Sequence, residues 1–291
     1  MKPAAFTYFS PSSLDQAVSL LADHAPEAKP LAGGQSLIPL MNFRLAQPRY
    51  LIDLNRIPEL SYIREADGTL AIGAMTRQFE AERSELVGRT IPLLTEALRL
   101  TGHPTIRHRG TIGGALAHAD PAAELPAVAL ALDAELVARG PAGTRTIPAR
   151  EFFLGPLSTA LAPDELLVEV RIPRLPPGTG WVFLELSRRH GDFAIVGVAA
   201  VLTLAPDGRI GQASLALCGA GPKPVRAARA EAALAGSEPS EERFREAGEI
   251  AAQEIDPDSD LHASADYRRR VAAVLVRRAL TEAHRRVTEG R

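Results

Sequence analysis

Short extended segments alternate with helix-like apolar spacing near the start of the chain. Strands are predicted over residues 6–9, 29–32 and 50–54. Ser12 or Ser13 can cap a helix, because apolar residues then recur every three or four positions at Leu14, Ala17, Val18 and Leu21. A second apolar segment, residues 37–45, follows a Gly-Gly break and also suits a helix. This order of elements indicates a small parallel α/β unit.

The middle of the chain has a different pattern. A strand is predicted over 70–74, a short helix over 77–83, and a longer helix over 91–101 with Pro92 in its first turn. Further strands, separated by Pro and Gly, are predicted over 135–139, 144–147 and 166–172. This arrangement is typical of an α+β region with an antiparallel sheet. The segment Arg174-Leu-Pro-Pro-Gly-Thr-Gly180 is the clearest linker, because two prolines and two glycines continue neither a helix nor a strand.

Beyond the linker, apolar runs over 181–187, 195–204 and 210–217 predict a three-stranded antiparallel sheet. The turn Pro206-Asp207-Gly208 joins the last two strands as a hairpin. After Pro224 the composition shifts to Ala, Glu and Arg, and three helices are expected, near 226–235, 241–254 and 264–288. This part of the chain is therefore expected to combine a sheet with a bundle of helices.

Composition excludes several classes of protein. The chain has 291 residues, of which 46% are hydrophobic and 23% charged, with a net charge of −2, so a general nucleic-acid binder is not expected. Cys218 is the single cysteine, which rules out an internal disulfide, a four-cysteine iron–sulfur cluster and a thiolate zinc site within the chain. No run of eighteen apolar residues and no signal-peptide core occur, so we expect a cytoplasmic protein without a membrane span.

The first candidate site is the glycine pair in Pro30-Leu-Ala-Gly-Gly-Gln-Ser-Leu37. A strand ends there, the two glycines permit unusual backbone geometry, and Ser36 can cap the next helix. Pro39 falls in the first turn of that helix, where a missing N–H is harmless. Free backbone N–H groups in such a loop could bind a diphosphate. The alternative is a simple turn after a strand.

The second candidate site lies between Arg107 and Pro126. Thr111 offers a hydroxyl there, and the pair Gly113-Gly114 is expected to expose backbone donors. Residues 117–125 are expected to form a loop, with a helix starting near Pro126. Asp120 and Glu124 could accept hydrogen bonds from the hydroxyls of a sugar or ribityl chain; alternatively, either residue caps the helix.

Other common sites are not supported by the sequence. Neither glycine loop matches the dinucleotide fingerprint of three spaced glycines, and no phosphate-binding loop ending in Gly-Lys-Ser/Thr occurs. No Gly-x-Ser-x-Gly motif is present, and His103, His108 and His118 lack the spacing of metal ligands. We therefore expect no catalytic side chain and no metal ligand in this chain.

Together, the two loops and several later motifs resemble the FAD-binding medium subunit of molybdenum hydroxylases, the family of xanthine dehydrogenase and aerobic carbon monoxide dehydrogenase. The motifs occur in the same order along nearly the whole chain: Ala32-Gly-Gly-Gln-Ser-Leu-Ile-Pro-Leu-Met41, Thr111-Ile-Gly-Gly114, Ala119-Asp-Pro-Ala-Ala-Glu124, Glu165-Leu-Leu-Val-Glu-Val-Arg-Ile-Pro173, Ser187-Arg-Arg-His-Gly-Asp-Phe-Ala194 and Ser264-Ala-Asp-Tyr-Arg-Arg269. The resemblance implies an α+β fold. A PCMH-type FAD-binding domain of two α/β subdomains (residues 1–177, divided near residue 57) would precede a C-terminal domain (178–291).

The resemblance also implies a noncovalent FAD and a set of residues that bind it. The backbone of both loops would hold the diphosphate, an acid would lie near the ribityl or sugar hydroxyls, and three later residues would lie near the isoalloxazine ring. The residues so implied are Leu31, Ala32, Gly33, Gly34, Gln35, Ser36, Leu37, Thr111, Ile112, Gly113, Gly114, Ala115, Asp120, Glu124, Leu167, Asp192 and Phe193. Two features depart from relatives. Ala115 replaces an Asn, and Leu184-Glu185 stand where eukaryotic xanthine dehydrogenases have a lysine near the ring.

The function implied is electron transfer. A large molybdopterin-binding subunit would oxidise the substrate, a small subunit would pass electrons through [2Fe–2S] clusters, and FAD in this chain would deliver them to an external acceptor. A dimer of such heterotrimers is expected from the resemblance. The substrate and the acceptor (NAD, a quinone, a cytochrome or oxygen) stay open. Two alternatives are a self-sufficient PCMH-type flavoprotein oxidase or dehydrogenase, and an assembly subunit without redox activity.

Overall fold

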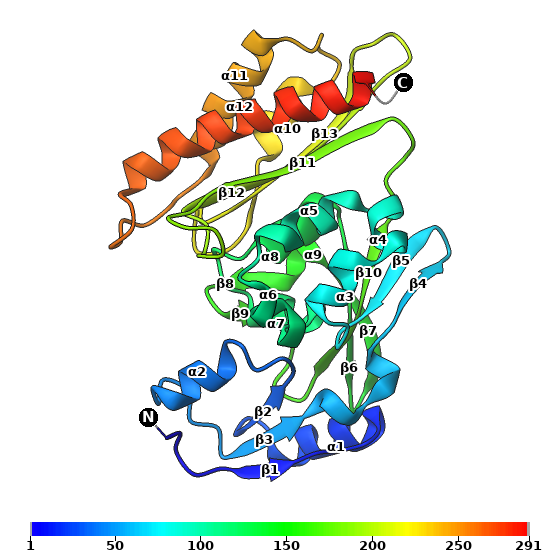
Figure 1. The fold of residues 1–291 in the computed structure, drawn as a ribbon, viewed down its shortest axis with the longest axis vertical. Coiled ribbons are helices and arrows are strands. Elements are labelled where there is room, and N and C mark those ends of the chain that lie inside the picture. Colours follow the sequence, from blue (N-terminus) through cyan, green and yellow to red (C-terminus); the bar gives the residue numbers. More distant parts are fainter. Residues whose placement is uncertain (1, 290–291) are drawn as a thin grey trace.

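The computed structural model describes residues 2–289 (Figure 1). Its N-terminal part is a three-stranded parallel sheet in the order β1-β3-β2, formed by β1 (Thr7–Phe9), β2 (Ala28–Leu31) and β3 (Tyr50–Asp53). Helix α1 (Leu14–His24) begins after Ser13, whose side chain accepts a hydrogen bond from the N–H of Gln16. Helix α2 (Leu37–Asn42) connects β2 to β3, and two 3₁₀ turns follow, η1 (Leu54–Arg56) and η2 (Pro58–Leu60). The expected parallel unit is confirmed.

The second part is built on a five-stranded antiparallel sheet in the order β4-β5-β10-β6-β7. Its strands are β4 (Ile63–Ala66), β5 (Thr69–Gly73), β6 (Glu135–Gly140), β7 (Gly143–Pro148) and β10 (Leu166–Pro173). A small hairpin, β8 (Phe153–Gly155) and β9 (Ser158–Thr159), lies outside the sheet. The antiparallel arrangement is the one that the strand pattern predicts.

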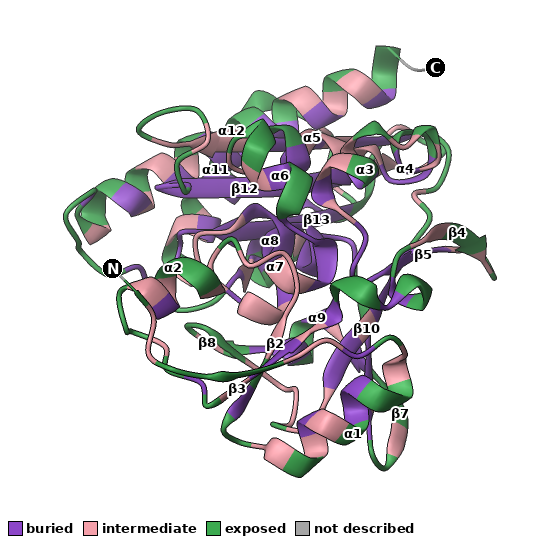
Figure 2. Cartoon of the chain, turned by 60° about the horizontal axis from the view of Figure 1, so that its bottom comes forward, coloured by how far each residue is buried: buried purple, intermediate pink, exposed green. Residues whose placement is uncertain are grey.

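Seven helices of the described chain belong to this second part: α3 (Gln78–Arg83), α4 (Glu85–Thr90), α5 (Pro92–Leu100), α6 (Pro104–Arg109), α7 (Ile112–His118), α8 (Glu124–Ala131) and α9 (Ala149–Phe152). The expected loop over 117–125 is shorter than predicted, because α7 continues to His118 and α8 begins at Glu124. Pro126 fits inside α8 since it occupies the first turn, where its missing N–H has no intrahelical partner. Every residue of α8 is buried, so this helix has no polar face (Figure 2).

The C-terminal sheet has four strands instead of the expected three. Their order is β11 (Thr179–Leu186), β12 (Val196–Leu204), β13 (Ile210–Cys218) and β14 (Val225–Arg226). The sequence pattern missed β14 because two residues after a proline carry no detectable periodicity. Helices α10 (Ala228–Leu234), α11 (Glu241–Glu254) and α12 (Ala265–Glu289) complete this part, and α12 packs along β11 and β12 (Figure 1).

The C-terminal sheet shares its core with the preceding part of the chain. Helix α8 packs on β12 and β13, and α5 packs on β11. Apolar side chains of the sheet, including those of Phe183 and Ala216, therefore join the hydrophobic cluster that contains α8. An ion pair also joins the two parts, because Arg286 on α12 contacts Glu96 on α5 at 2.9 Å. Within the C-terminal part, Arg286 also donates to the carbonyl of Trp181 on β11 at 2.7 Å. The sheet is thus held between two layers of helices.

Candidate functional site

The two glycine loops, which lie far apart in the sequence, meet in the fold. A Cβ placed on Gly33 would lie 2.3 Å from the carbonyl oxygen of Arg109 and 2.8 Å from the Cα of Gly110. A Cβ on Gly114 would lie 3.2 Å from the Cβ of Ala32. The first loop therefore touches both the end of α6 and the first turn of α7, with no room for an additional side chain at Gly33.

Two polar side chains that the sequence did not indicate as site residues link the two loops by hydrogen bonds. The amide Nδ2 of Asn55 donates to the carbonyl of Ala32 at 2.9 Å, which ties Asn55 to the first loop. The guanidinium of Arg77 donates to Oδ1 of Asn55 and to the carbonyl of Arg109, each at 2.5 Å. A continuous chain of hydrogen bonds thus links the two loops. No sequence motif marks this contact, because Asn55 and Arg77 lie outside both glycine segments.

The first loop presents backbone donors. Within residues 2–289, the N–H groups of Gly33, Gly34, Gln35 and Ser36 donate to no other protein group. Gly34 has a φ of +73°, a left-handed conformation that glycine adopts without a Cβ penalty. Ser36 precedes α2 but makes no capping hydrogen bond through its side chain, so its hydroxyl also stays available. The loop has the free donors that an anion at a helix N-terminus requires.

The second loop differs from expectation. Its glycine amides are not exposed donors, because the N–H of Gly113 donates to the carbonyl of Ala74 at 2.9 Å and the N–H of Gly114 donates to Oγ1 of Thr111 at 3.0 Å. The N–H of Ile112 likewise donates to the carbonyl of Thr76 at 3.0 Å. The prediction that Gly113-Gly114 exposes donors is therefore wrong, and tight packing explains the glycine: a Cβ on Gly113 would lie 2.4 Å from the Cβ of Ala74.

A hollow of about 320 Å³ opens on the first loop. It is lined by residues of the loop, of α2 and of α6: Gly33, Gly34, Gln35, Ile38, Pro39, Asn42 and Arg109. Arg77 lies close to it, since its guanidinium donates to the carbonyl of Arg109, and burial and then the charge of Arg109 lower the pKa of Arg77. Asp53 lies near both arginines and offsets part of their charge. No carboxylate lines the hollow. Its donors and its positive charge therefore favour an anion.

The two predicted acids have different surroundings. The carboxylate of Asp120 accepts a hydrogen bond from the N–H of Ala122 at 2.9 Å and so stabilises the turn between α7 and α8. Glu124 is buried in the first turn of α8, where its Oε2 accepts from the hydroxyl of Thr101 at 3.1 Å. Neither acid is the N-cap of α8, since that position is Ala123 and lacks a side-chain hydrogen bond.

Glu124 has a second acid as a neighbour. Burial raises the pKa of Glu124 to about 7. Burial, and then the charge of Glu124, raises the pKa of Glu185 on β11 to about 8. The Oε2 atom of Glu185 is buried and has no hydrogen-bond partner among the described residues. The sequence marks Glu185 only as a departure from relatives; its proximity to Glu124 depends on how the C-terminal sheet packs against α5 and α8.

The remaining predicted residues lie on other elements. Leu167 is buried in β10, opposite Ala138 of β6. Asp192 and Phe193 lie in the loop between β11 and β12, and the ring of Phe193 is exposed. That loop packs on the start of α6, because a Cβ on Gly191 would lie 2.6 Å from the ring of His103. The end of α6 touches Gly33, so about 9 Å of helix separates these two contacts.

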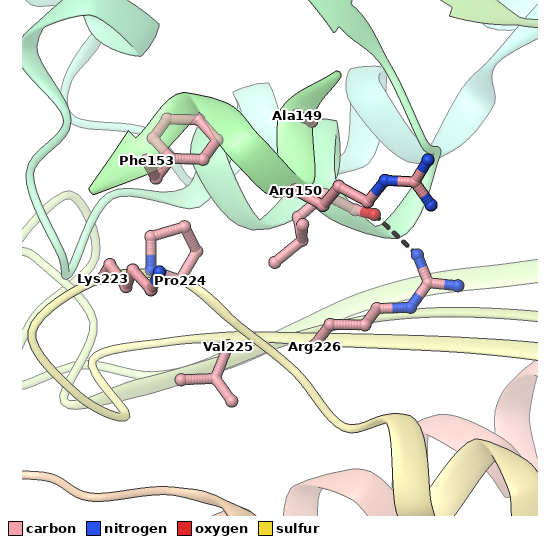
Figure 3. Close-up of a pocket in the computed structure, with 8 residues that line it drawn as sticks. Ala149, Arg150, Phe153, Lys223, Pro224, Val225 and Arg226 are labelled. Atoms are coloured by element: carbon pink, nitrogen blue, oxygen red, sulfur yellow. Dashed lines mark hydrogen bonds between the residues drawn. The ribbon is translucent and has the colours of Figure 1, made fainter. Parts of the chain in front are cut away.

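A second hollow, of about 230 Å³, lies between α8, α9 and the β13–β14 connection. Figure 3 shows Arg226 at its edge, with the guanidinium donating to the carbonyl of Leu130 at 2.8 Å. The same guanidinium donates to Asp133 at 3.1 Å and to Ser214 at 2.7 Å. None of the predicted site residues lines this hollow. Arg226 instead joins the C-terminal sheet to the end of α8.

Residues 2–289 contain neither a cluster of metal ligands nor a membrane-spanning helix. No group of three or more His, Cys, Asp or Glu side chains could hold a metal ion in this part of the chain. Among its helices, none combines the length and the apolar character needed to cross a bilayer. Cys218 is a free, buried cysteine.

Comparison with protein families gives two adjacent matches. Residues 4–175 match the family described as the FAD binding domain in molybdopterin dehydrogenase. Residues 181–283 match the family described as the CO dehydrogenase flavoprotein C-terminal domain. The first match alone covers more than half of the chain.

Individual proteins are similar over nearly the whole length. The 6-hydroxypseudooxynicotine dehydrogenase complex subunit alpha of Paenarthrobacter nicotinovorans is 45% identical over 97% of this chain and 96% of its own. The carbon monoxide dehydrogenase medium chain of Hydrogenophaga pseudoflava is 41% identical over 97% and 98% of the two chains. Among solved structures, carbon monoxide dehydrogenase from Hydrogenophaga pseudoflava matches with a TM-score of 0.96 at 44% identity, covering 98% of this chain and 99% of that one. Quinoline 2-oxidoreductase from Pseudomonas putida 86 matches with a TM-score of 0.94 at 38% identity, covering 99% of each chain.

Proposed function

The chain belongs to the family of FAD-binding medium subunits of molybdenum hydroxylases, and from this we propose that it transfers electrons from [2Fe–2S] clusters of a partner subunit through FAD to an external acceptor. It is the flavoprotein part of an oxidoreductase complex whose molybdopterin and iron–sulfur centres belong to other subunits. The single observation that carries the proposal is the meeting of the two glycine loops beside a hollow with free backbone donors.

The residues around the hollow fit the diphosphate of FAD. Free N–H groups of Gly33 to Ser36 can donate to phosphate oxygens, and the guanidinium of Arg109 supplies positive charge at the same place. Arg77 and Asn55 would hold the loops in position without contacting the cofactor. In the second loop Thr111 is the remaining candidate donor, since its N–H donates to none of the described residues.

When bound, FAD supplies the ability to exchange electrons one or two at a time, and the chain contributes position and electrostatics. The exposed ring of Phe193 is available to cover the isoalloxazine. The second carboxylate oxygen of Asp120 accepts no hydrogen bond from residues 2–289, so it can accept one from a hydroxyl. We propose that Glu124 has a structural role beside the cofactor site. Its carboxyl is buried and accepts from Thr101, so it holds the start of α8 beside the end of α5.

The proposal extends to the assembly. The partners are a large molybdopterin-binding subunit and a small [2Fe–2S] subunit, and a cytoplasmic dimer of heterotrimers is the arrangement that we propose. Within the chain, we propose an FAD-binding domain over residues 1–177, divided near residue 57, and a C-terminal domain over 178–291. Gly178, with a φ of +74°, lies in the connection between β10 and β11 and supports a boundary there.

The test is the flavin content of the purified chain. We expect about one FAD per chain, released on acid denaturation because no covalent bond holds it, and reduced rapidly by substrate in the assembled complex. A chain that takes up no flavin after reconstitution would refute the proposal. Turnover of a small organic substrate by the isolated chain would instead favour a self-sufficient flavoprotein.

A further inference from the structure

Arg268 is a buried cation to which the proposed function gives no role. It belongs to the motif Ser264-Ala-Asp-Tyr-Arg-Arg269, is the fourth residue of α12 and is only 7% exposed. A positive charge is disfavoured near the N-terminus of a helix, because the helix dipole is itself positive there. Removing a guanidinium from water also costs free energy unless its donors find partners. The contacts that offset both effects therefore indicate what Arg268 does.

The guanidinium of Arg268 donates to backbone carbonyls at the ends of two different strands. Its Nη1 donates to the carbonyl of Ile195 at 2.5 Å and to that of Gly219 at 3.1 Å. Its Nη2 donates to a carboxylate oxygen of Asp260 at 2.7 Å, which balances the charge. Ile195 directly precedes β12 and Gly219 directly follows β13, so one side chain links the start of one strand to the end of the next.

The backbone around these two carbonyls is closely packed. Gly219 has a left-handed φ of +66°, and a Cβ there would lie 2.5 Å from the carbonyl oxygen of Ile195 and 3.0 Å from that of Ala194. The carbonyl oxygens of Ile195 and Gly219 both carry partial negative charge, yet both lie within 3.1 Å of the same nitrogen. The cation therefore holds together two groups that would otherwise repel each other.

The two linked carbonyls lie close in the chain to residues expected at the flavin end of FAD. Ile195 follows Phe193 by two residues, and the exposed ring of Phe193 is available to cover the isoalloxazine. The N–H of Gly219 donates to the carbonyl of Pro121 at 2.8 Å, and Pro121 directly follows Asp120, which can accept from a hydroxyl of the ribityl chain. Through these contacts the guanidinium fixes the loop expected at the ring relative to the turn expected at the ribityl chain.

The contacts of Arg268 are separate from the hollow that fits the diphosphate. Neither Ile195, Gly219 nor Asp260 lines that hollow, which is formed by the first glycine loop, α2 and the end of α6. Different residues would therefore hold the two ends of the cofactor. A change at Arg268 should affect the flavin end and leave the diphosphate end as it is.

We propose that Arg268 is a positioning residue for the flavin end of FAD, an inference that rests on the proposed function. It acts through Ile195 and Gly219 and not by contact with the cofactor. Binding groups that are already fixed in place lose less conformational entropy when the ligand binds. Without the guanidinium, the loop that carries Phe193 and the turn that carries Asp120 lose their common support, so the affinity for the flavin end falls.

The test measures the affinity of the isolated chain for two probes, FAD and ADP. ADP has the adenosine and the diphosphate of FAD but no flavin, so it reports on the hollow alone. Arg268→Gln should raise the Kd for FAD by about tenfold and leave the Kd for ADP within about twofold of the wild-type value. The visible absorption spectrum of the bound flavin should also shift, because it responds to the surroundings of the ring.

Two further variants make the test specific. Arg268→Lys should recover part of the lost FAD affinity, because an ammonium keeps the charge but lacks the planar fork that serves two carbonyls and a carboxylate. If the Gln variant does not fold, the Lys variant decides by the same measurements. Arg269→Gln is the matched control, since the Arg269 side chain is 38% exposed and pairs with Asp256 at 3.3 Å. The control should change neither Kd nor the flavin spectrum.

The two affinities separate the possible outcomes. An equal loss of FAD and ADP binding in the Arg268 variants would show a purely structural role and overturn the positioning proposal. Unchanged FAD affinity and an unchanged flavin spectrum, or an equal effect in the Arg269 control, would also overturn it and leave the proposed function intact. A wild-type chain that takes up no FAD would instead overturn the proposed function.

Discussion

Replacing Gly33 with alanine should push the two glycine loops apart and weaken the binding of FAD. The new Cβ would lie 2.3 Å from the carbonyl oxygen of Arg109 and 2.8 Å from the Cα of Gly110. Both are backbone atoms, so no flexible side chain can move aside to make room. Because carbon atoms make favourable contacts only beyond about 3.5 Å, the loop must move by roughly 1 Å.

The expected size of the effect follows from this clash. Overpacking in a closely packed region typically costs about 1–3 kcal/mol. If the loop relieves the clash by moving, the N–H groups of residues 33–36 lose their alignment with the diphosphate, and the same energy corresponds to an increase of about 5- to 150-fold in the Kd for FAD. If the loop stays in place, the cost appears instead as a lower free energy of unfolding.

Gly88 provides the control, since it lies in helix α4 and a Cβ there meets no atom within 4 Å. Gly88→Ala should leave FAD binding unchanged and stabilise the chain by up to about 1 kcal/mol. The assay is titration of apo protein with FAD, followed by flavin fluorescence, together with thermal unfolding of both variants. A Gly33→Ala chain with the wild-type Kd and melting temperature would refute the packing argument.

Three further predictions use the buried polar groups. In the apo chain, burial raises the pKa of Glu124 from 4.5 to about 7 and that of Glu185 from 4.5 to about 8, so unfolding releases protons between these values. Stability should therefore fall as the pH rises from about 4.5 to about 8 and level off above that. The double variant Glu124→Gln/Glu185→Gln should flatten the melting temperature over this range, and an unchanged slope would contradict the assignment. Arg226→Met should lower the free energy of unfolding, measured by chemical denaturation, by about 3 kcal/mol, because it removes the hydrogen bonds that join the C-terminal sheet to α8. The exposed Arg150→Met should change it by less than about 0.5 kcal/mol, and equal effects of the two variants would count against a bridging role. Burial raises the pKa of the Cys218 thiol well above its usual range, so iodoacetamide should label it only after unfolding, and rapid labelling of the native chain would show that the strand end opens.

Local patterns determined most of the elements and the candidate motifs. Most strands of the three larger sheets have short-range periodicity, and Ser13 before α1 and Pro92 in α5 are local signals of helix starts. These features depend on neighbours along the chain, so the sequence carries them directly. The missed elements, such as β14 and α7, are short or glycine-rich, and their conformation depends on contacts with distant residues.

The features of the candidate site also separate into those that one segment determines and those that depend on distant residues. The sequence identified the first glycine loop and the free donors that follow a strand, since both are properties of one segment. It could not determine that Gly33 would pack on Arg109, that Asn55 and Arg77 would link the loops, or that the amides of Gly113 and Gly114 would be used internally. Each of these depends on which distant backbone atoms lie nearby after folding, and only the tertiary structure decides that.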